Sequence, residues 1–227
     1  MSPSSSTEST DTFVRRGKSL SFRLALGYGG NIGALQNMGA ARMGLTEAEL
    51  PDIVTRWREA SPKIVQLWSD LGNAMMNAMK GSEVQELQYG VRVWKTPHVL
   101  HMQIPSGRCL RYFNPKIATN KFGGESISYD AYDMGKWSRV DTWGGRAVEN
   151  LIQATARDCL LVSMQRVSKR YPDIVMHVHD EMIVEVPEAE ADEALAFICG
   201  EMGKPIDWAP GLLLRGDGYT TPFYCKD

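Results

Sequence analysis

A short ionisable segment, His177-Val178-His179-Asp180-Glu181, lies between two apolar runs rich in β-branched residues, at 171–176 and 182–187. This order of apolar run, charged segment and apolar run predicts a β-hairpin whose bend carries the ionisable side chains. A carboxylate held on a rigid hairpin can bind a hard divalent cation, as phosphoryl and nucleotidyl transfer require. An ordinary exposed hairpin turn is the alternative, so this segment alone leaves two interpretations open.

Helical and extended patterns follow one another along the rest of the chain in an order typical of an α+β fold. Thr46-Glu47-Ala48-Glu49 has the form of a capping box, and Ser61-Pro62 supplies an N-cap followed by a proline at the first helical position. Glycines at 27–30 and at Gly81 are typical helix ends. These signals predict helices at about 32–43, 46–60, 62–80, 145–170 and 189–202, strands within 88–113 with a turn at Gly107-Arg108, and then a loop to about 140.

Composition restricts the classes of protein to which the chain can belong. With 227 residues, of which 43% are hydrophobic and 23% charged, it is expected to be globular. The formal net charge of −2 gives no overall basic surface, so contact with nucleic acid must come from a local one. The four cysteines form no C-x-x-C pair, which argues against a disulfide framework or a zinc ribbon. Without a signal peptide or an apolar run of about 18 residues, a cytoplasmic protein without membrane contact is expected.

The long helix expected at 145–170 carries a polar stripe beside its apolar face. Asn150, Gln153 and Arg157 are spaced by three and four residues, which places them on one side of that helix. Amide and guanidinium donors can hydrogen-bond the minor-groove acceptors that every base pair presents in similar places. A solvated helix flank is the alternative interpretation.

A second candidate binding segment precedes the glycine cluster at 27–30. Arg16, Leu20, Leu24 and Tyr28 recur at intervals of four and share a helix face if the helix begins early enough. An arginine at one end and an aromatic ring at the other could bracket a triphosphate and its base, with Gly29 leaving room for a neighbouring base. A glycine-rich loop beside an ordinary helix is the alternative.

Three motifs, in order and spacing, resemble signatures of family A DNA polymerases (the DNA polymerase I type), particularly those of the phage and prophage branch. Leu24-Ala25-Leu26-Gly27-Tyr28-Gly29-Gly30 resembles the fingers-helix signature of that family. Residues 143–154 with Arg157-Asp158 resemble its minor-groove-tracking helix, and Val178-His179-Asp180-Glu181 is similar to its last catalytic signature. Ile104-Pro105-Ser106-Gly107-Arg108 and the ending from Trp208 onward also fit, so the likeness runs from about residue 21 to the end.

The resemblance implies template-directed addition of dNTPs to a primer 3′-OH, with primer–template DNA and dNTPs as partners and two Mg²⁺ ions in the complete polymerase. Asp180 would be a carboxylate ligand of the catalytic magnesium ions, and Glu181 a neighbouring acidic group. His179 would contact the primer end. The hairpin would then belong to the palm of the polymerase.

The same resemblance implies roles for residues outside the hairpin. Tyr28 would form the floor against which the incoming nucleotide and the template base are sorted, and Arg16 would contact the triphosphate. Asn150, Gln153 and Arg157 would bind DNA along the minor groove of the new pair. The implied organisation is a disordered tail at 1–12, a fingers-like segment at 13–140 and a C-terminal palm portion at 141–227.

The chain departs from the family pattern in two respects. Leu20 stands where the family has a phosphate-binding lysine, and Lys18 cannot replace it because two residues on a helix turn the side chain by roughly 200°. The family's other metal-binding aspartate lies well upstream of the fingers helix, where this chain has a serine- and threonine-rich tail. The chain is therefore expected to need an upstream polymerase fragment, separated from it by an intron, an intein or a gene split.

Two other functions remain open from the sequence. The chain could be a non-catalytic polymerase remnant that still binds primer–template DNA. It could also be a metallohydrolase, because His177-x-His179-Asp180 is similar to a cluster of zinc ligands.

Overall fold

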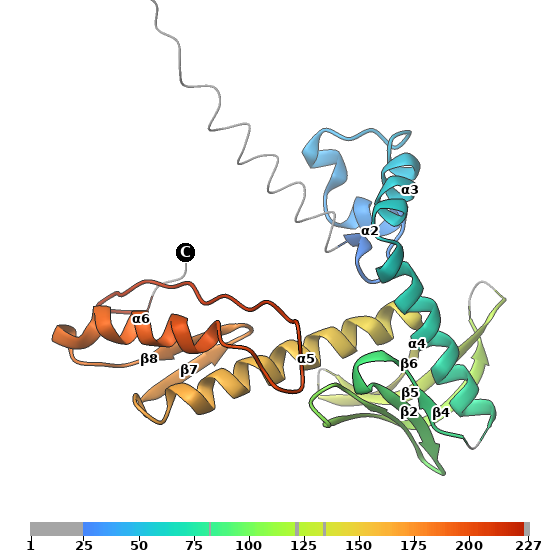
Figure 1. The fold of residues 1–227 in the computed structure, drawn as a ribbon. Coiled ribbons are helices and arrows are strands. Elements are labelled where there is room, and N and C mark those ends of the chain that lie inside the picture. The colour runs from blue at the N-terminus through green and yellow to red at the C-terminus, as the bar shows by residue number, and fades with distance from the viewer. Residues whose placement is uncertain (1–24, 82, 121–122, 134, 225–227) are drawn as a thin grey trace, which may run out of the picture. The chain divides into compact units, whose positions relative to one another are not determined.

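The computed structural model describes residues 25–224, apart from residues 82, 121–122 and 134. It confirms the α+β class, because helices and two separate β-sheets are both present (Figure 1). The tail predicted at 1–12 lies outside the described residues, as do Arg16, Lys18, Leu20 and Leu24. No helix of the described residues is long and apolar enough to cross a membrane.

The chain divides into two compact units, which interleave along the sequence. The first unit comprises residues up to 87, 93–101 and 111–150, and the second comprises 88–92, 102–110 and 151 to the end. The long helix α5 (Gly144–Val167) contributes its first turns to the first unit and the remainder to the second.

Before its strands, the first unit contains α2 (Ile32–Asn37), the 3₁₀ helix η1 (Ala40–Met43), α3 (Leu50–Ala60) and α4 (Pro62–Lys80). The single helix predicted at 32–43 is wrong in one respect, because the chain breaks between α2 and η1. Gly39 adopts a left-handed conformation there, with φ 83°. Glycine has no Cβ and takes this conformation without strain, whereas a helix cannot continue through it.

The Thr46–Glu49 capping pattern forms hydrogen bonds but does not begin the helix at Thr46. The backbone N–H and the hydroxyl of Thr46 donate to Glu49 Oε2 at 2.8 and 2.6 Å. These bonds lower the pKa of the Glu49 carboxyl. They close a turn, and α3 starts after it at Leu50.

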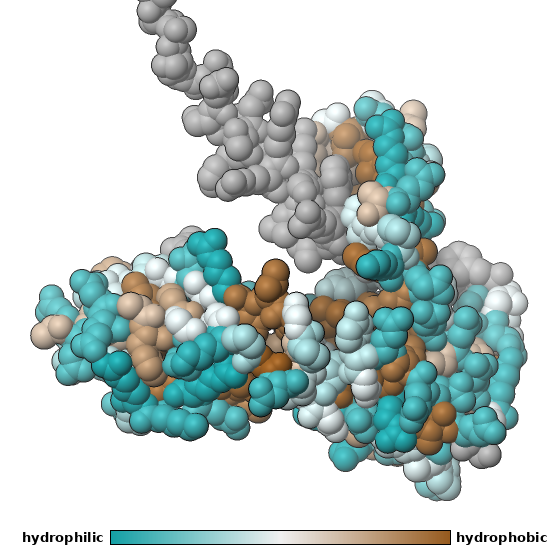
Figure 2. Space-filling model, viewed as in Figure 1, coloured by the Kyte–Doolittle hydropathy of each residue, from teal (hydrophilic) through white to brown (hydrophobic). Residues whose placement is uncertain are grey.

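The outward side of α3 is mostly hydrophilic (Figure 2). A small core joins α2, η1 and α3 through the buried residues Ala25, Leu26, Leu35, Ala40, Leu50 and Val54.

Helix α4 has the predicted bounds. Ser61 is its N-cap residue, Pro62 its first residue and Gly81 its C-cap. The buried side of this helix is made by Leu71, Ala74, Met75 and Ala78.

A six-stranded sheet follows α4, with its strands in sequential order: β1 (Gln85–Glu86), β2 (Arg92–Thr96), β3 (Val99–Gln103), β4 (Cys109–Thr119), β5 (Glu125–Asp133) and β6 (Lys136–Thr142). The predicted turn at Gly107-Arg108 is confirmed between β3 and β4, and Gly107 has φ 86°.

The loop expected up to about residue 140 is wrong, because β5 and β6 occupy most of it. Serine, glycine and aspartate are typical of loops, but here they occupy strand positions with specific partners. Ile127 pairs with Thr142 across the two strands, and both side chains are buried. Asp130 pairs with Arg139, whose guanidinium donates to the Asp130 carboxylate at 2.7 Å. Cross-strand pairing of this kind outweighs local loop preference.

The second unit contains a two-stranded hairpin, β7 (Ile174–Val178) and β8 (Glu181–Val184), followed by η3 (Glu188–Glu190) and α6 (Ala191–Met202). The predicted hairpin is confirmed, and the helix predicted at 189–202 corresponds to α6. The helix predicted at 145–170 is α5, which ends three residues earlier, at Val167. A core of Val167, Tyr171, Ala194 and the apolar residues packed on them joins α5, the hairpin and α6.

Candidate functional site

The tip of the β7–β8 hairpin exposes the predicted acidic group. Val178 pairs with Glu181, so His179 and Asp180 alone form the two-residue turn. Such short turns match the twist of the strands when their first residue has positive φ, and His179 has φ 50°. Histidine is among the few non-glycine residues that are enriched in this region. The side chain of Asp180 is exposed and that of Glu181 half-buried.

Packing beneath the turn fixes the hairpin within its unit. Ile174, Met182 and Val184 contact the core formed around Val167 and Tyr171. The register shifts between Ile174 and Met176, which indicates a β-bulge on β7. The hairpin is therefore a supported element that holds its carboxylates at a defined place.

Arg157 of α5 contacts the hairpin directly. Its Nη1 lies 3.0 Å from His177 Nδ1, and its Nη2 lies 3.3 Å from His177 Nε2. Guanidinium has no acceptor, so a hydrogen bond here requires an unprotonated ring nitrogen on His177. The contact ties the polar stripe of α5 to strand β7, one residue pair away from the turn.

The other two members of the stripe have different surroundings. The side chain of Gln153 is exposed. Asn150 is half-buried, and its Nδ2 donates to the hydroxyl of Tyr112 on β4 at 3.1 Å. Burial raises the pKa of Tyr112 to about 12, so this phenol is neutral at neutral pH. Of the three predicted donors, Gln153 is exposed to solvent, whereas Asn150 and Arg157 are engaged by protein groups.

A buried carboxylate on α5 was missed as a site by sequence reasoning. Asp158 accepts two hydrogen bonds from Arg108 Nε, at 2.8 and 3.1 Å, and one from the Ser106 hydroxyl. Arg108 Nη2 also donates to the carbonyl of Ala154 at 2.9 Å. A signal was present, because Asp158 lies seven residues after the apolar Leu151 and so shares its helix face. A charged residue at a core-facing position requires a partner.

The glycine-rich turn at 27–30 lies beside the start of α5. Ala25 and Leu26 are helical, and the helix ends at the glycine cluster as predicted. Tyr28 lies in the turn, half-buried, and Gly29 has φ 79°. A Cβ on Gly145 would lie 2.2 Å from the Tyr28 carbonyl oxygen, and one on Gly144 would lie 2.0 Å from the Trp68 carbonyl oxygen. Glycine at both positions permits the backbone of α5 to approach the turn and α4.

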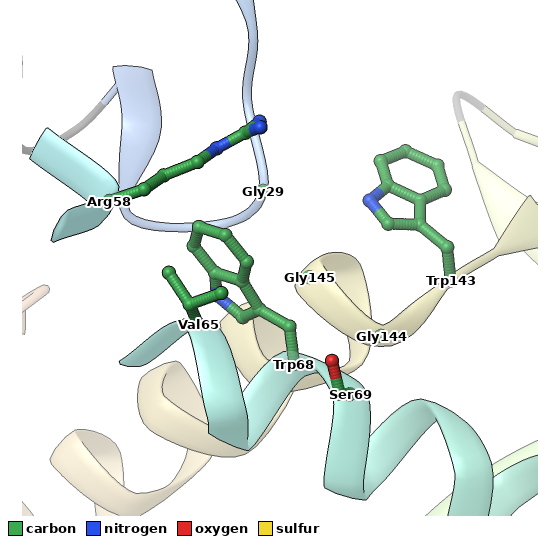
Figure 3. A pocket seen from close by; sticks show the side chains of 8 residues that line it. All are labelled: Gly29, Arg58, Val65, Trp68, Ser69, Trp143, Gly144 and Gly145. Carbon is green, nitrogen blue, oxygen red and sulfur yellow. The ribbon is translucent and has the colours of Figure 1, made fainter. Parts of the chain in front are cut away.

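A pocket of about 350 Å³ opens at this approach (Figure 3). This volume is at the small end of the range for ligand sites. The pocket is lined by Gly29 of the turn, Arg58 of α3, three residues of α4 and the start of α5: Gly29, Arg58, Val65, Trp68, Ser69, Trp143, Gly144 and Gly145. Two indole rings give it aromatic surface, and Arg58 adds a positive charge.

The aromatic and basic walls of the pocket are held by specific contacts. The Trp68 ring stacks on Trp57, with centroids 6.0 Å apart, and its Nε1 donates to the Gly27 carbonyl at 3.0 Å. Arg58 Nη2 donates to the Gly30 carbonyl at 3.2 Å. In the part of the chain that the structure describes, the buried Arg58 Nε has no hydrogen-bond partner. The pocket therefore has one wall made by a fixed ring and another made by an anchored cationic side chain.

We expect Gly145→Ala to destabilise the protein by about 1–3 kcal/mol, because the new Cβ would overlap the Tyr28 carbonyl and the backbone must shift. Chemical denaturation followed by circular dichroism measures this loss. Gly33→Ala is the matched control, because a Cβ on Gly33 meets nothing within 4 Å inside α2. Alanine is the better helix former, so the control is expected to be neutral or stabilising. Equal losses of stability in the two variants would contradict the close approach.

The structure brings some predicted residues together and leaves others apart. His179, Asp180 and Glu181 are consecutive at the hairpin, and Gly29 lies at the pocket. Among the described residues there is no group of three or more His, Cys, Asp and Glu side chains that could hold a metal ion. The zinc cluster suggested by His177, His179 and Asp180 is therefore not formed, and Arg16 lies outside the described residues.

Comparison with known proteins gives one informative similarity. The chain is 45% identical over 208 residues to a protein named DNA polymerase from Bacillus phage SP02. The aligned part covers 90% of this chain and 32% of the phage protein, so the chain spans about a third of the length of that relative. No protein-family model matches the chain, and no solved structure matches it.

Proposed function

We propose that the chain is the C-terminal fingers-and-palm portion of a family A DNA polymerase, which adds dNTPs to a primer 3′-OH as a template directs. The observation that carries this proposal is the 45% identity, extending over 90% of the chain, to a phage DNA polymerase. The exposed Asp180 at a supported hairpin turn adds the chemistry that the activity requires. In this assignment residues 13–140 belong to the fingers and residues 141–227 to the palm.

The palm portion would supply one metal-binding carboxylate. Carboxylate oxygens are preferred ligands of Mg²⁺, so Asp180 fits the ion in kind, with Glu181 as a second acidic group beside it. Two carboxylates are too few to hold the metal ions alone, and the described residues contain no group of three or more His, Cys, Asp and Glu side chains that could do so. Two bound magnesium ions would stabilise the charge that develops during nucleotidyl transfer. The hairpin of this chain would hold Asp180 in position. His179, in the same turn, would contact the primer end.

The fingers portion would bind the base that is being copied. The pocket beside Gly29 offers the Trp68 and Trp143 indoles as stacking surfaces, and Arg58 adds a positive charge to its lining. Tyr28, in the adjoining turn, would form the floor against which the incoming nucleotide is sorted. Arg16, which precedes the described residues, would contact the triphosphate.

Helix α5 would follow the minor groove of the newly made pair. Gln153 is exposed, and its amide would donate to the acceptors that all base pairs share. Asn150 and Arg157 are held by Tyr112 and His177 respectively, which would restrict their positions for DNA binding. This use of sequence-independent acceptors suits an enzyme that must accept every correct pair.

The remaining metal ligands would come from polypeptide outside this sequence, as in an upstream polymerase fragment. A chimera tests this directly: the present chain replaces the aligned region of the Bacillus phage SP02 polymerase. We expect this chimera to extend a primer in the presence of Mg²⁺ and all four dNTPs, and the isolated chain to give only background extension. A folded chimera that binds primer–template DNA but never extends the primer would favour a non-catalytic, DNA-binding remnant.

A further inference from the structure

Strands β4, β5 and β6 expose aromatic side chains on one of their two faces. Tyr132 pairs with Trp137 across β5 and β6, and Phe113 of β4 pairs with Asp130, two residues before Tyr132. Residues directly opposite each other in antiparallel strands share a face, as do residues two apart on one strand. Phe113, Tyr132 and Trp137 therefore lie on the same face, which we call the aromatic face.

The three rings form an exposed cluster. Phe113, Tyr132 and Trp137 are 42%, 63% and 63% exposed. The Trp137 centroid lies 6.4 Å from that of Phe113 and 5.6 Å from that of Tyr132, in edge-to-face pairs. Apolar side chains scattered singly over a surface need no explanation, but three large rings in mutual contact indicate an interaction site. Edge-to-face packing leaves ring faces free to stack with another planar group.

The opposite face of these strands is already covered by the protein. Tyr112 and Ile127 on that face are buried, and Asn150 of α5 donates to the Tyr112 hydroxyl. The core of the first unit therefore lies on one side of the strands. On the other side Ser126 and Ser128 are buried, and the exposed part of the aromatic face is the end that carries Phe113, Tyr132 and Trp137. The three exposed rings are therefore not part of the core that contains Tyr112 and Ile127.

Positive charge is interleaved with the rings. The register of β4 against β5 shifts between Phe113 and Lys116, which indicates a β-bulge. The cations of the aromatic face are Arg111 before this bulge, Lys116 after it, and Arg139 on β6. Three cations and two acids share the face, in the order Arg111, Lys116, Asp130, Arg139 and Asp141. Arg139 forms an ion pair with Asp130, with Nη1 2.7 Å from Oδ1, so Arg111 and Lys116 face Asp141 with an excess of one positive charge, on a chain whose formal net charge is −2. A local basic surface of this kind attracts a polyanion.

We propose that the aromatic face binds single-stranded DNA, with bases stacked on Phe113, Tyr132 and Trp137 and phosphates near the interleaved cations. Stacking on aromatic side chains within a basic surface is the usual way in which proteins hold unpaired strands without reading sequence. Duplex DNA is a poorer ligand for such a face, because its bases are stacked on one another and present only their edges. The inference rests on the proposed function, since a polymerase must hold a template strand that is not yet paired.

A direct binding experiment tests the aromatic face without polymerisation. Fluorescence anisotropy measures the affinity of the full chain for a labelled oligo(dT), in the absence of metal and dNTPs and at low salt. We expect Trp137→Ala and Phe113→Ala each to weaken binding about tenfold, the loss typical of one stacked base. Trp137→Phe is expected to retain most of the affinity. Phe223→Ala removes an aromatic ring that is 70% exposed outside the sheet, and it serves as the matched control.

The outcomes separate this inference from the proposed function. Loss of oligo(dT) affinity in Trp137→Ala and Phe113→Ala, with Phe223→Ala unchanged, supports the aromatic face. The inference is overturned if the chain does not bind oligo(dT), or if the double variant Phe113→Ala/Trp137→Ala binds it within twofold of the parent. It is also overturned if the double variant loses only self-association in light scattering, because the face would then contact another copy. If the aromatic face is overturned but the chimera still extends primers, the polymerase assignment stays intact.

Discussion

In the chimeric polymerase, Asp180→Asn is expected to lower the rate of nucleotide incorporation at least about 10³-fold. A bound metal ion contributes several kcal/mol of charge stabilisation to such a transfer, and each 1.36 kcal/mol corresponds to a factor of ten in rate. The amide keeps the size of the side chain but cannot act as an anionic ligand. Since Asp180 is exposed at the turn, the substitution should leave folding intact. Single-turnover primer extension with saturating Mg²⁺ and dNTP measures the effect.

Two comparisons make this result specific to the hairpin acid. Asp207→Asn changes an exposed aspartate in another turn of the same unit and should leave the rate within about twofold. DNA affinity, measured separately by anisotropy, should survive Asp180→Asn because the loss concerns catalysis. Glu181→Gln should cost less than Asp180→Asn, since Glu181 is half-buried and paired across the hairpin with Val178. Full turnover in Asp180→Asn would remove the hairpin from the mechanism.

The hairpin could be predicted from the sequence because its signals are local. Two β-branched runs flank a charged segment, and the turn lies inside that segment, at His179 and Asp180. The bounds of α4 were also predicted, since Pro62 at its first position and Gly81 at its C-cap are local signals. In both places local preference and tertiary packing favour the same structure.

Strands β5 and β6 could not be predicted because their stability comes from partners distant in the sequence. Ser126 and Ser128 are buried, although serine is typical of loops. Arg139 donates to Ser128 and to Asp130 across the strands, so each polar group gains a partner only after pairing. The pocket is similar: Trp68 and Trp143 are 75 positions apart in the sequence, and nothing local relates them to Gly29.

The ion pair of Arg108 with Asp158 joins two motifs that lie far apart in the sequence. Arg108 ends the Ile104–Arg108 segment between β3 and β4, whereas Asp158 lies on α5, 50 residues later. The carboxylate of Asp158 is 9% exposed and the Arg108 side chain 45% exposed. Asp158 is thus the member that cannot reach water if its partner is removed. The neighbouring Arg157 contacts His177, so the pair fixes the part of α5 that touches the hairpin.

We expect Arg108→Ala to lower the free energy of unfolding by about 2–3 kcal/mol. Removal of one partner from a buried pair typically costs 3–5 kcal/mol, because the other charge stays buried without compensation. The lower figure follows from the exposure of Arg108 and from the Ser106 hydroxyl, which still donates to Asp158. Urea denaturation followed by circular dichroism measures the change. A separate double-mutant cycle consists of Arg108→Leu, Asp158→Leu and the variant that carries both substitutions.

An exposed ion pair elsewhere in the chain serves as the control. Arg215 and Asp217 form an ion pair in which both side chains are more than 80% exposed, at 85% and 83%. Exposed pairs contribute little, so Arg215→Ala should cost less than about 0.5 kcal/mol. The double variant Arg108→Leu/Asp158→Leu should be more stable than Arg108→Leu alone, because it no longer buries an unpaired carboxylate. If Arg108→Ala cost no more than Arg215→Ala, the buried pair would not fix α5, and the position of Arg157 against His177 would need another cause.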